Sequence, residues 1–393
     1  MSIPIVDKKV NILVLVCLSI IFGFSWVSQS LNNLSLYFII PTLFIYSFLS
    51  QPRIIINYKP LRILFVFLLW SGLTTVASNN MDASLKELKL LGGIFMLSFI
   101  FVVFAKQNSS YVKYIYIGYI ITFLVNVLNG FSLGLLNSKN ERFSSELINA
   151  NEFGYYGFFA IVASFFLWKN VLQDKAGNYK ILFFSFIAIS LLSVTANFYA
   201  ASRAGIIISL GTSFILLNIN YFYPFSRKKI FRISILIVLI YTVMGVVSNL
   251  YFDSVLEQRI NNKNIYEESR FDLIKLAFNT GLDNLFFGVG PGNFLYFTPT
   301  LHFSHSTFFE IFANNGLIGL IIYLSLFFYA FKKVIILKKQ NKKTGIVFLF
   351  IITFYLIYNL FYVFHTSLFL GSFLFLIIAS IDMLIINKQN IKI

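Results

Sequence analysis

The sequence predicts an all-α, polytopic integral membrane protein. Of its 393 residues, 58% are hydrophobic, and the mean hydropathy is +0.80, well above the range of soluble globular proteins. Apolar runs of about 20 residues, the length that crosses the hydrocarbon core, recur along the chain. Short segments rich in charge or turn residues separate these runs. These observations predict about twelve transmembrane helices in a single polytopic membrane domain, residues 1–393.

The apolar runs place the expected spans along the chain, within a few residues at each end. The first run follows Lys8 and Lys9, like the charged start of a signal peptide, but its length and the lack of a small-residue cleavage site favour a retained helix. The two runs that flank Ser202 and Arg203 are counted separately although almost no loop joins them. The expected spans are 10–27, 34–50, 61–78, 88–105, 112–130, 153–172, 181–199, 204–223, 231–250, 314–331, 344–363 and 367–387.

The distribution of charge predicts that both termini are cytoplasmic. With this orientation every inner connection is basic, and most of the 31 Lys and Arg residues lie inside, whereas most of the 15 acidic residues lie outside. A wrong number of spans would scramble this pattern from the error onward. The formal net charge of +16 therefore reflects the basic connections on the cytoplasmic side of the membrane. It is spread between apolar runs and forms no single patch, so membrane lipid, and not nucleic acid, is the expected partner.

Residues 251–313 form the longest outer segment. Within it, Phe271, Ile274 and Phe278 recur at helical spacing, with Leu273 beside them. This pattern predicts a short amphipathic helix that lies on the outer surface of the membrane. The segment also holds most of the residues whose chemistry is unusual for a membrane surface, so it is the expected catalytic loop.

Arg203 is the first candidate for binding an anion. It stands between two spans with almost no loop, which places it at or below the headgroups. The small residues Ala204 and Gly205 beside it allow another helix or a ligand to approach closely. The alternative is an arginine that extends to the surface and binds lipid phosphate.

Arg270 is the second candidate, because it precedes Ile274 by one helical turn and so leans toward the apolar side of the predicted helix. The alternative is a local ion pair with Glu267 or Asp272, which would contribute little. Arg142 and Arg259 are weaker candidates, since both lie in loops where solvated charge is the ordinary case.

A glycine-rich turn follows the predicted amphipathic helix. Gly288, Gly290 and Gly292 alternate around Pro291. Such a turn permits positive φ and lets backbone N–H groups approach an anion, although it can equally be only a turn. It is not a dinucleotide or P-loop fingerprint, because no strand precedes it and no Gly-Lys-Ser/Thr follows.

The three histidines, His302, His305 and His365, all fall on the predicted outer side. Two spaced by three residues could bind a metal, but no third ligand is suitably spaced, so no metal site is expected. The single Cys17 excludes a disulfide framework and a cysteine metal site. An imidazole can instead accept the proton of a hydroxyl or orient it, and the alternative is a hydrogen-bonded structural histidine.

Glu310 follows His305 at the start of an expected span. One helical turn separates it from Asn314, so both lie on one face of the helix. Its carboxylate can pair with an arginine, orient an acceptor, or cap the helix start, where negative charge favours the helix dipole.

These residues together resemble the O-antigen ligase/polymerase superfamily of bacterial envelope glycan enzymes. The resemblance covers about residues 200–325, and the motifs occur in the same order and spacing. Asn149-Ala150-Asn151 before a span is also similar to the Asn-Pro-Asn element of that family, whereas Ser306 stands where Asn is often found. The motifs are Ser202-Arg203-Ala204-Gly205, Arg270, Phe286 to Phe294, His305 to Glu310, and Asn315 to Gly319.

The resemblance implies a GT-C-like membrane glycosyltransferase that inverts the anomeric centre and uses neither metal nor cofactor. Donor and acceptor would be glycans linked to undecaprenyl diphosphate, on the outer face of the bacterial cytoplasmic membrane. Arg203 and Arg270 would hold the diphosphate, and His305 would activate or position the acceptor hydroxyl. The further residues expected to bind substrate are Glu310, Arg142, Arg259, Gly290, Gly292 and Asn151.

Polymerases and ligases share these motifs. The His-Ser-Thr-Phe-Phe-Glu sequence and the compact outer loop favour a polymerase of O-antigen or capsular polysaccharide, with a chain-length regulator and a flippase as expected partners. The alternative within the family is an O-antigen ligase that transfers the finished chain to lipid A–core. The alternative from another class is a flippase or transporter. It is disfavoured because the expected spans, apart from Asp382 and residues near their ends, are uncharged.

Overall fold

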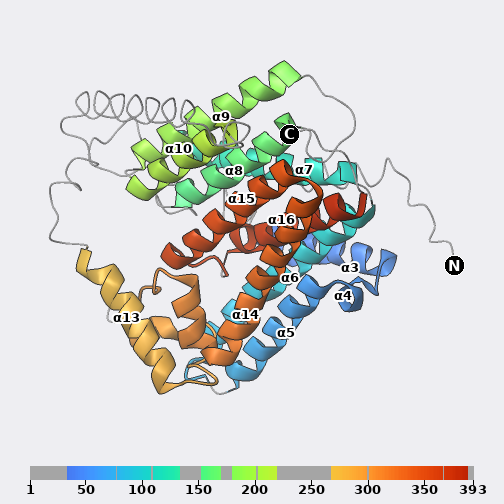
Figure 1. The fold of residues 1–393 in the computed structure, drawn as a ribbon. Coiled ribbons are helices and arrows are strands. Elements are labelled where there is room, and N and C mark those ends of the chain that lie inside the picture. The colour runs from blue at the N-terminus through green and yellow to red at the C-terminus, as the bar shows by residue number, and fades with distance from the viewer. Residues whose placement is uncertain are drawn as a thin grey trace. The chain divides into compact units, whose positions relative to one another are not determined.

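The protein is helical throughout the residues that the structure describes (Figure 1). The computed structural model describes residues 33–76, 78–107, 109–132, 152–169, 179–200, 202–218, 267–298, 301–365 and 367–387. In chain order the elements are η1 (Ser35–Ile39), α3 (Ile40–Ser50), α4 (Ile54–Asn57), α5 (Lys59–Thr75), α6 (Met81–Gln107), α7 (Ser109–Ser132), α8 (Glu152–Trp168), α9 (Tyr179–Tyr199), α10 (Arg203–Asn218), α13 (Glu267–Asp283), η2 (Phe294–Phe297), α14 (Thr307–Gln340), α15 (Lys342–Phe361) and α16 (Leu368–Asn387).

Six helices in the described part of the chain are long and apolar enough to cross a membrane. The predicted all-α membrane protein is therefore confirmed. The expected spans 10–27 and 231–250 lie outside the described residues, each of the others overlaps a helix, and the total of about twelve stays a prediction, as does the GT-C-like fold. The six helices are Met81–Gln107, Tyr111–Gly130, Lys180–Tyr199, Thr307–Gln340, Lys342–Phe361 and Leu368–Ile386, and shorter apolar helices occur at Ser35–Ser50, Gly154–Trp168 and Ala204–Asn218.

The chain divides into two compact units. Unit 1 contains the described residues of Asn33–Val112 and Asn264–Asn390, and unit 2 contains those of Lys113–Lys263. The whole described part of the expected loop 251–313 therefore belongs to unit 1, whereas Arg203 belongs to unit 2. The single domain over 1–393 stays a prediction.

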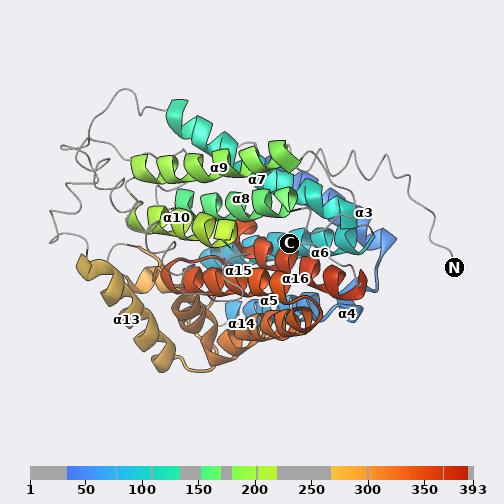
Figure 2. The ribbon, with the colours of Figure 1, turned by 45° about the horizontal axis from the view of Figure 1, so that its top comes forward.

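In unit 1, α14 is the helix around which the others pack. It contacts α5, α13, α15 and α16, and α6 packs against α5 and α16. Figures 1 and 2 show α14 running beside α5 in both views. The core between these helices is apolar and aromatic, with Phe67 of α5 and Phe327 of α14 both buried and both in contact with the ring of Tyr323.

A break at Gly316 divides α14 into two parts. Gly316 has φ 69° and ψ −173°, a conformation that residues with a Cβ rarely adopt. The nine residues before it form a short half-helix, whose last carbonyl groups have no intrahelical donor. Three of these carbonyls find donors elsewhere in unit 1. That of Ala313 accepts from the N–H of Val289, that of Asn314 from the N–H of Gly290, and that of Asn315 from the indole N–H of Trp70.

In unit 2, small residues let α8, α9 and α10 approach closely (Figure 1). A Cβ on Gly154 of α8 would lie 2.7 Å from the Cα of Gly205 in α10, and a Cβ on Gly157 would meet the hydroxyl of Ser193. The hydroxyls of Ser193 and Ser209 lie 2.8 Å apart in the same seam. This confirms that the small residues after Arg203 admit a neighbouring helix.

Replacing Gly316 by alanine should destabilise unit 1. The added Cβ would collide with the backbone carbonyl of Phe286, and the positive φ disfavours any Cβ. We expect a loss of about 2 kcal/mol or more, measured as a lower apparent unfolding temperature by tryptophan fluorescence in detergent. Gly72→Ala is the matched control, because no atom lies within 4 Å of a Cβ at that helical position. Equal unfolding temperatures for both variants would contradict the structural role of the break.

Candidate functional site

Helix α13 carries Arg270 and has two apolar faces. Leu273, Ala277 and Thr280 are buried, whereas Phe271 and Phe278 of the predicted stripe are 75% and 43% exposed. The helix is confirmed at the expected position. Leu273 and Ala277, which lie beside the predicted stripe, pack against the protein, whereas Phe271 is exposed, as expected of a residue that faces the membrane. Arg270 itself is exposed, and no ion pair joins it to Asp272, the described one of its two expected carboxylate partners.

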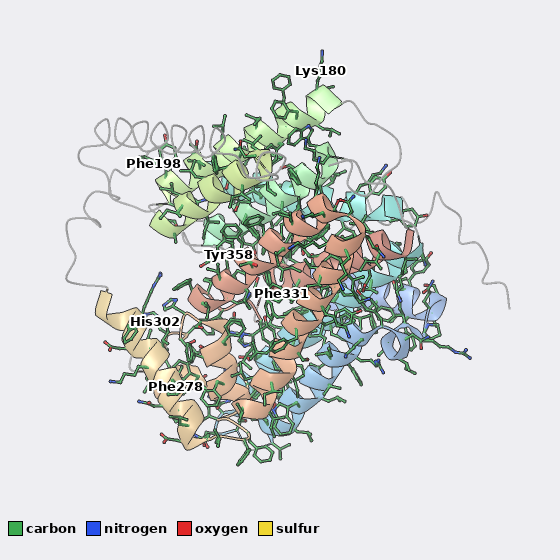
Figure 3. The ribbon with its side chains drawn as sticks, in the orientation of Figure 1. Lys180, Phe198, Phe278, His302, Phe331 and Tyr358 are labelled. Atoms are coloured by element: carbon green, nitrogen blue, oxygen red, sulfur yellow. The ribbon has the colours of Figure 1, made fainter. Side chains whose placement is uncertain are left out.

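Helix α13 packs tightly against the half-helix at the start of α14. A Cβ on Gly281 would collide with the ring of Phe312, and the ring of Phe278 meets that of Phe309 edge-on at 6.1 Å. Ala277, Phe294 and Ala313 form a buried cluster beneath this contact. Figure 3 labels Phe278 on α13 and shows His302 beside the same helix, in the loop before α14. Arg270 and the histidine loop are thus held by one small core.

The glycine-rich turn connects the end of α13 to the first part of α14 by backbone hydrogen bonds. The N–H groups of Gly288, Val289 and Gly290 donate to the carbonyls of Asn284, Ala313 and Asn314. These donors are therefore committed to the protein itself. Gly292 is buried, and a Cβ there would lie 3.0 Å from the Ala83 carbonyl oxygen. The geometry supports a structural role for the turn, and substrate binding by Gly290 and Gly292 stays a prediction.

Asn293 fastens the same turn to the start of α6. Its side-chain oxygen accepts from the N–H of Asn80 at 2.8 Å, and its amide donates to the Ser84 hydroxyl at 2.7 Å and to the Pro291 carbonyl at 3.0 Å. The side chain is 1% exposed. The bonds to Ser84 and Pro291 are buried, which strengthens the attachment of the turn.

His305 lies in a loop that is strained and firmly anchored. Its φ is 60°, in the left-handed region that few side chains adopt. On the C-terminal side, the Thr307 N–H donates to the Tyr362 carbonyl at 3.0 Å, and the Thr307 hydroxyl accepts from the Phe364 N–H at 2.8 Å. The Ser306 hydroxyl donates a long bond to the Asn359 carbonyl at 3.5 Å. The end of α15 thus fixes the backbone around His305.

The imidazole of His305 is neutral at physiological pH. Its pKa is lowered from 6.5 to about 4, chiefly because partial burial disfavours the charged form, and further because the positive charge of Arg270 and then His302 repels a proton. Unit 1 therefore brings Arg270 and His305 close enough for their charges to interact. A neutral imidazole can accept a hydrogen bond or a proton from a hydroxyl.

Glu310 is fully buried and holds the loop. One carboxylate oxygen accepts from the Ser304 N–H at 2.7 Å, and the other lies 3.5 Å from the Asn314 amide nitrogen on the same helix face. The sequence left three roles open for Glu310. The geometry supports one close to helix capping, because the carboxylate binds the backbone of Ser304, the residue before His305, at the start of α14. A direct contact with substrate stays a prediction for Glu310.

The remaining predicted residues belong to unit 2 or lie outside the described residues. Arg203 is the first residue of α10 in unit 2, directly after Ser202, whose hydroxyl accepts from the Gly205 N–H at 3.2 Å. The break between α9 and α10 confirms two helices at this point. Arg142, Arg259 and Asn151 lie outside the described residues.

The sequence singled out Asn314 and Asn315 but assigned them no role, and the structure shows that their side chains hold the frame of the site. The Asn314 side-chain oxygen accepts from the Phe294 N–H at 2.8 Å, and the Asn315 amide donates to the Ser71 hydroxyl at 3.0 Å. Both asparagines are fully buried. In the sequence they are two adjacent amides directly before a glycine in an apolar run. Burying amides in a membrane helix is unfavourable unless they have hydrogen-bond partners, so the pattern pointed to such partners.

In the described part of the chain, no group of three or more His, Cys, Asp or Glu side chains is arranged to hold a metal ion. The candidate site combines the guanidinium of Arg270, the neutral imidazole of His305 and an anchored backbone loop.

A family model described as O-antigen ligase matches residues 188–324. The matched region contains α10 with Arg203, α13 with Arg270, the glycine-rich turn and the His305 loop. This match supports the resemblance of the chain to the O-antigen ligase/polymerase superfamily. Members of this family are glycosyltransferase-like enzymes whose substrates are lipid-linked glycans. A comparison with curated proteins found none that matches this chain.

The low pKa of His305 predicts a specific titration. In a protein labelled with ¹³C-histidine, His305 should titrate near pH 4, so it is fully neutral at pH 7 and gains its proton only as the pH falls through that value. Arg270→Gln removes a repelling charge and should raise this pKa. NMR with His302→Gln and His365→Gln variants assigns the three signals. A value near 6.5 in the unaltered protein, or no response to Arg270→Gln, would contradict the electrostatic coupling.

Proposed function

We propose that this protein is an inverting glycosyltransferase that polymerises undecaprenyl-diphosphate-linked oligosaccharide repeat units into O-antigen or capsular polysaccharide. The observation that carries the proposal is the coupling of Arg270 with His305 in one rigid part of unit 1, inside the region that matches the family. The membrane is the bacterial cytoplasmic membrane, and the reaction takes place on its outer face, as the positive-inside distribution of charge favours.

In the proposed reaction, a hydroxyl of the acceptor glycan attacks the anomeric carbon of the donor sugar. A new glycosidic bond forms as the bond between that carbon and the diphosphate oxygen breaks, which inverts the anomeric centre. His305 accepts the hydroxyl proton, and undecaprenyl diphosphate leaves as the anion. The donor supplies all of the energy, so no ATP is needed.

Arg270 stabilises the charge that develops on the leaving diphosphate. A guanidinium offers paired N–H donors that match phosphate oxygens, and it is charged at every physiological pH. Arg203 is proposed for the same role from the family motif. Fixed guanidinium groups of this kind can take the place that Mg²⁺ holds in other diphosphate-dependent transferases.

Donor binding adjusts His305 for its role. In the free protein the charge of Arg270 helps to keep the pKa of His305 low. A diphosphate beside Arg270 offsets that charge, which raises the pKa and makes the imidazole a stronger base once the donor is in place. The strained φ of His305 holds the ring in one orientation before substrate arrives.

The proposal is tested with the pure protein in liposomes that contain a lipid-linked repeat unit. His305→Ala should lower kcat by about 10²- to 10⁴-fold, because a positioned base is lost. Arg270→Ala and Arg203→Ala should each lower it by about 10²- to 10³-fold. Lys275→Ala, which removes an exposed cation from the same helix as Arg270, and His302→Ala are the matched controls and should retain activity. Full activity of the arginine and His305 variants would refute the mechanism.

The same assay separates the two family activities. A polymerase builds a ladder of chain lengths without lipid A–core, whereas a ligase transfers glycan only when core is supplied. We expect a ladder without core, and we expect a metal chelator to leave its yield unchanged, because arginines replace the metal. Transfer that requires core would favour the ligase instead. Movement of the intact lipid-linked unit across the bilayer without bond formation would favour a transporter.

A further inference from the structure

Glu87 and His365 are titratable side chains that are buried together in unit 1. Glu87 belongs to α6, and His365 lies in the loop between α15 and α16. The Glu87 carboxylate oxygen Oε1 is 3.3 Å from His365 Nε2, and both side chains are almost inaccessible. Burying such groups costs several kcal/mol unless the surroundings compensate. The proposed reaction assigns neither residue a role.

The hydrogen bonds of this pair are incomplete. Glu87 Oε1 and both ring nitrogens of His365 have no hydrogen-bond partner among the described residues. The two groups are within ion-pair distance, but no hydrogen bond joins them. The small cavity beside His365 is lined mainly by apolar side chains, so it supplies no partner for the ring. Buried polar groups left in this way usually have a purpose other than stability.

The pair is linked to the loop that carries His305. Glu87 and His365 both lie close enough to Glu310 for electrostatic interaction, and Glu310 accepts the Ser304 N–H at 2.7 Å. Ser304 directly precedes His305. On its other side, the Glu87 carboxylate lies against the glycine-rich turn, 3.1 Å from where a Cβ on Gly292 would stand. The pair therefore adjoins both segments that frame the candidate site.

We propose that Glu87 and His365 are positioning residues for glycosyl transfer, and that they act through Glu310 on the loop of His305. Glu87 lies against the glycine-rich turn at Gly292, and His365 directly follows Phe364, whose N–H donates to the Thr307 hydroxyl beside the loop. Glu310 accepts the Ser304 N–H, which holds the residue before His305 and so supports the left-handed conformation of His305. The inference rests on the proposed function and adds two residues to its machinery.

Kinetics distinguish positioning from substrate binding. Glu87→Gln and His365→Gln should lower kcat about 10- to 100-fold and change the KM for the lipid-linked donor less than about 2-fold, because the diphosphate is held by arginines that these variants leave intact. Glu87→Asp keeps the charge and should recover much of the lost kcat.

The matched control is Asp382→Asn. Asp382 forms a partly buried ion pair in unit 1, with its Oδ1 2.7 Å from Lys333 Nζ. Lys333 lies about 25 Å along the straight part of α14 from the break at Gly316, so this pair is remote from the His305 loop. Its loss should leave kcat unchanged per folded protein.

Hydrogen exchange provides a readout that does not depend on activity. The amide protons of Ser304 and Ser306 are bonded to Glu310 and to the Ser304 hydroxyl. They should exchange about 10-fold faster in Glu87→Gln and His365→Gln, and at the normal rate in Asp382→Asn. Unchanged exchange and kcat in the first two variants, or equal losses in the control, would overturn the inference. If the unaltered protein makes no polysaccharide, the proposed function fails, while the exchange rates still decide whether the pair orders the loop.

Discussion

Three backbone carbonyl groups, released where α14 breaks at Gly316, hold unit 1 in the form that its candidate site requires. In a continuous helix these carbonyls would be bonded within the helix. Here the glycine-rich turn supplies donors to two of them and Trp70 supplies one to the third. Each bond contributes about 1 kcal/mol net, but an unpaired carbonyl in an apolar interior would cost more. The break, the turn and α5 must therefore form together, and α13 and the His305 loop are positioned as a consequence.

The same anchoring suits Arg270 and His305 to the proposed reaction. His305 is held in a left-handed conformation by bonds on both sides, to Glu310 through Ser304 and to the end of α15 through Thr307. Arg270 is presented by a helix that packs directly on the half-helix of α14. A base and an anion-binding cation placed in advance need little reorganisation during the reaction, which is the main source of electrostatic catalysis.

Buried polar groups have different structural roles in the two units. In unit 2, small residues and hydroxyls line the seam of α8, α9 and α10, where they permit close helix packing. In unit 1, buried amides and carboxylates collect around the loop and the turn, where they fix irregular backbone. Irregular backbone is tolerated at membrane depth only where protein groups satisfy it. The polar residues of unit 1 therefore mark the place where regular helix is interrupted, which is also the candidate site.

The sequence by itself determined the helical membrane class, the positions of most helices, the resemblance to one family, and Arg270 and His305 as candidate site residues, because apolar periodicity and motif spacing are local properties of the chain. It identified a helix at Phe271 to Phe278, but not the elements against which Leu273 and Ala277 pack. Only the tertiary structure decided that the N–H groups of Gly288 and Gly290 serve distant carbonyls, that Glu310 supports the loop, and that Glu87 meets His365. The physical reason is that each of these depends on a partner far along the chain, and pairing across such separations leaves no local pattern in sequence.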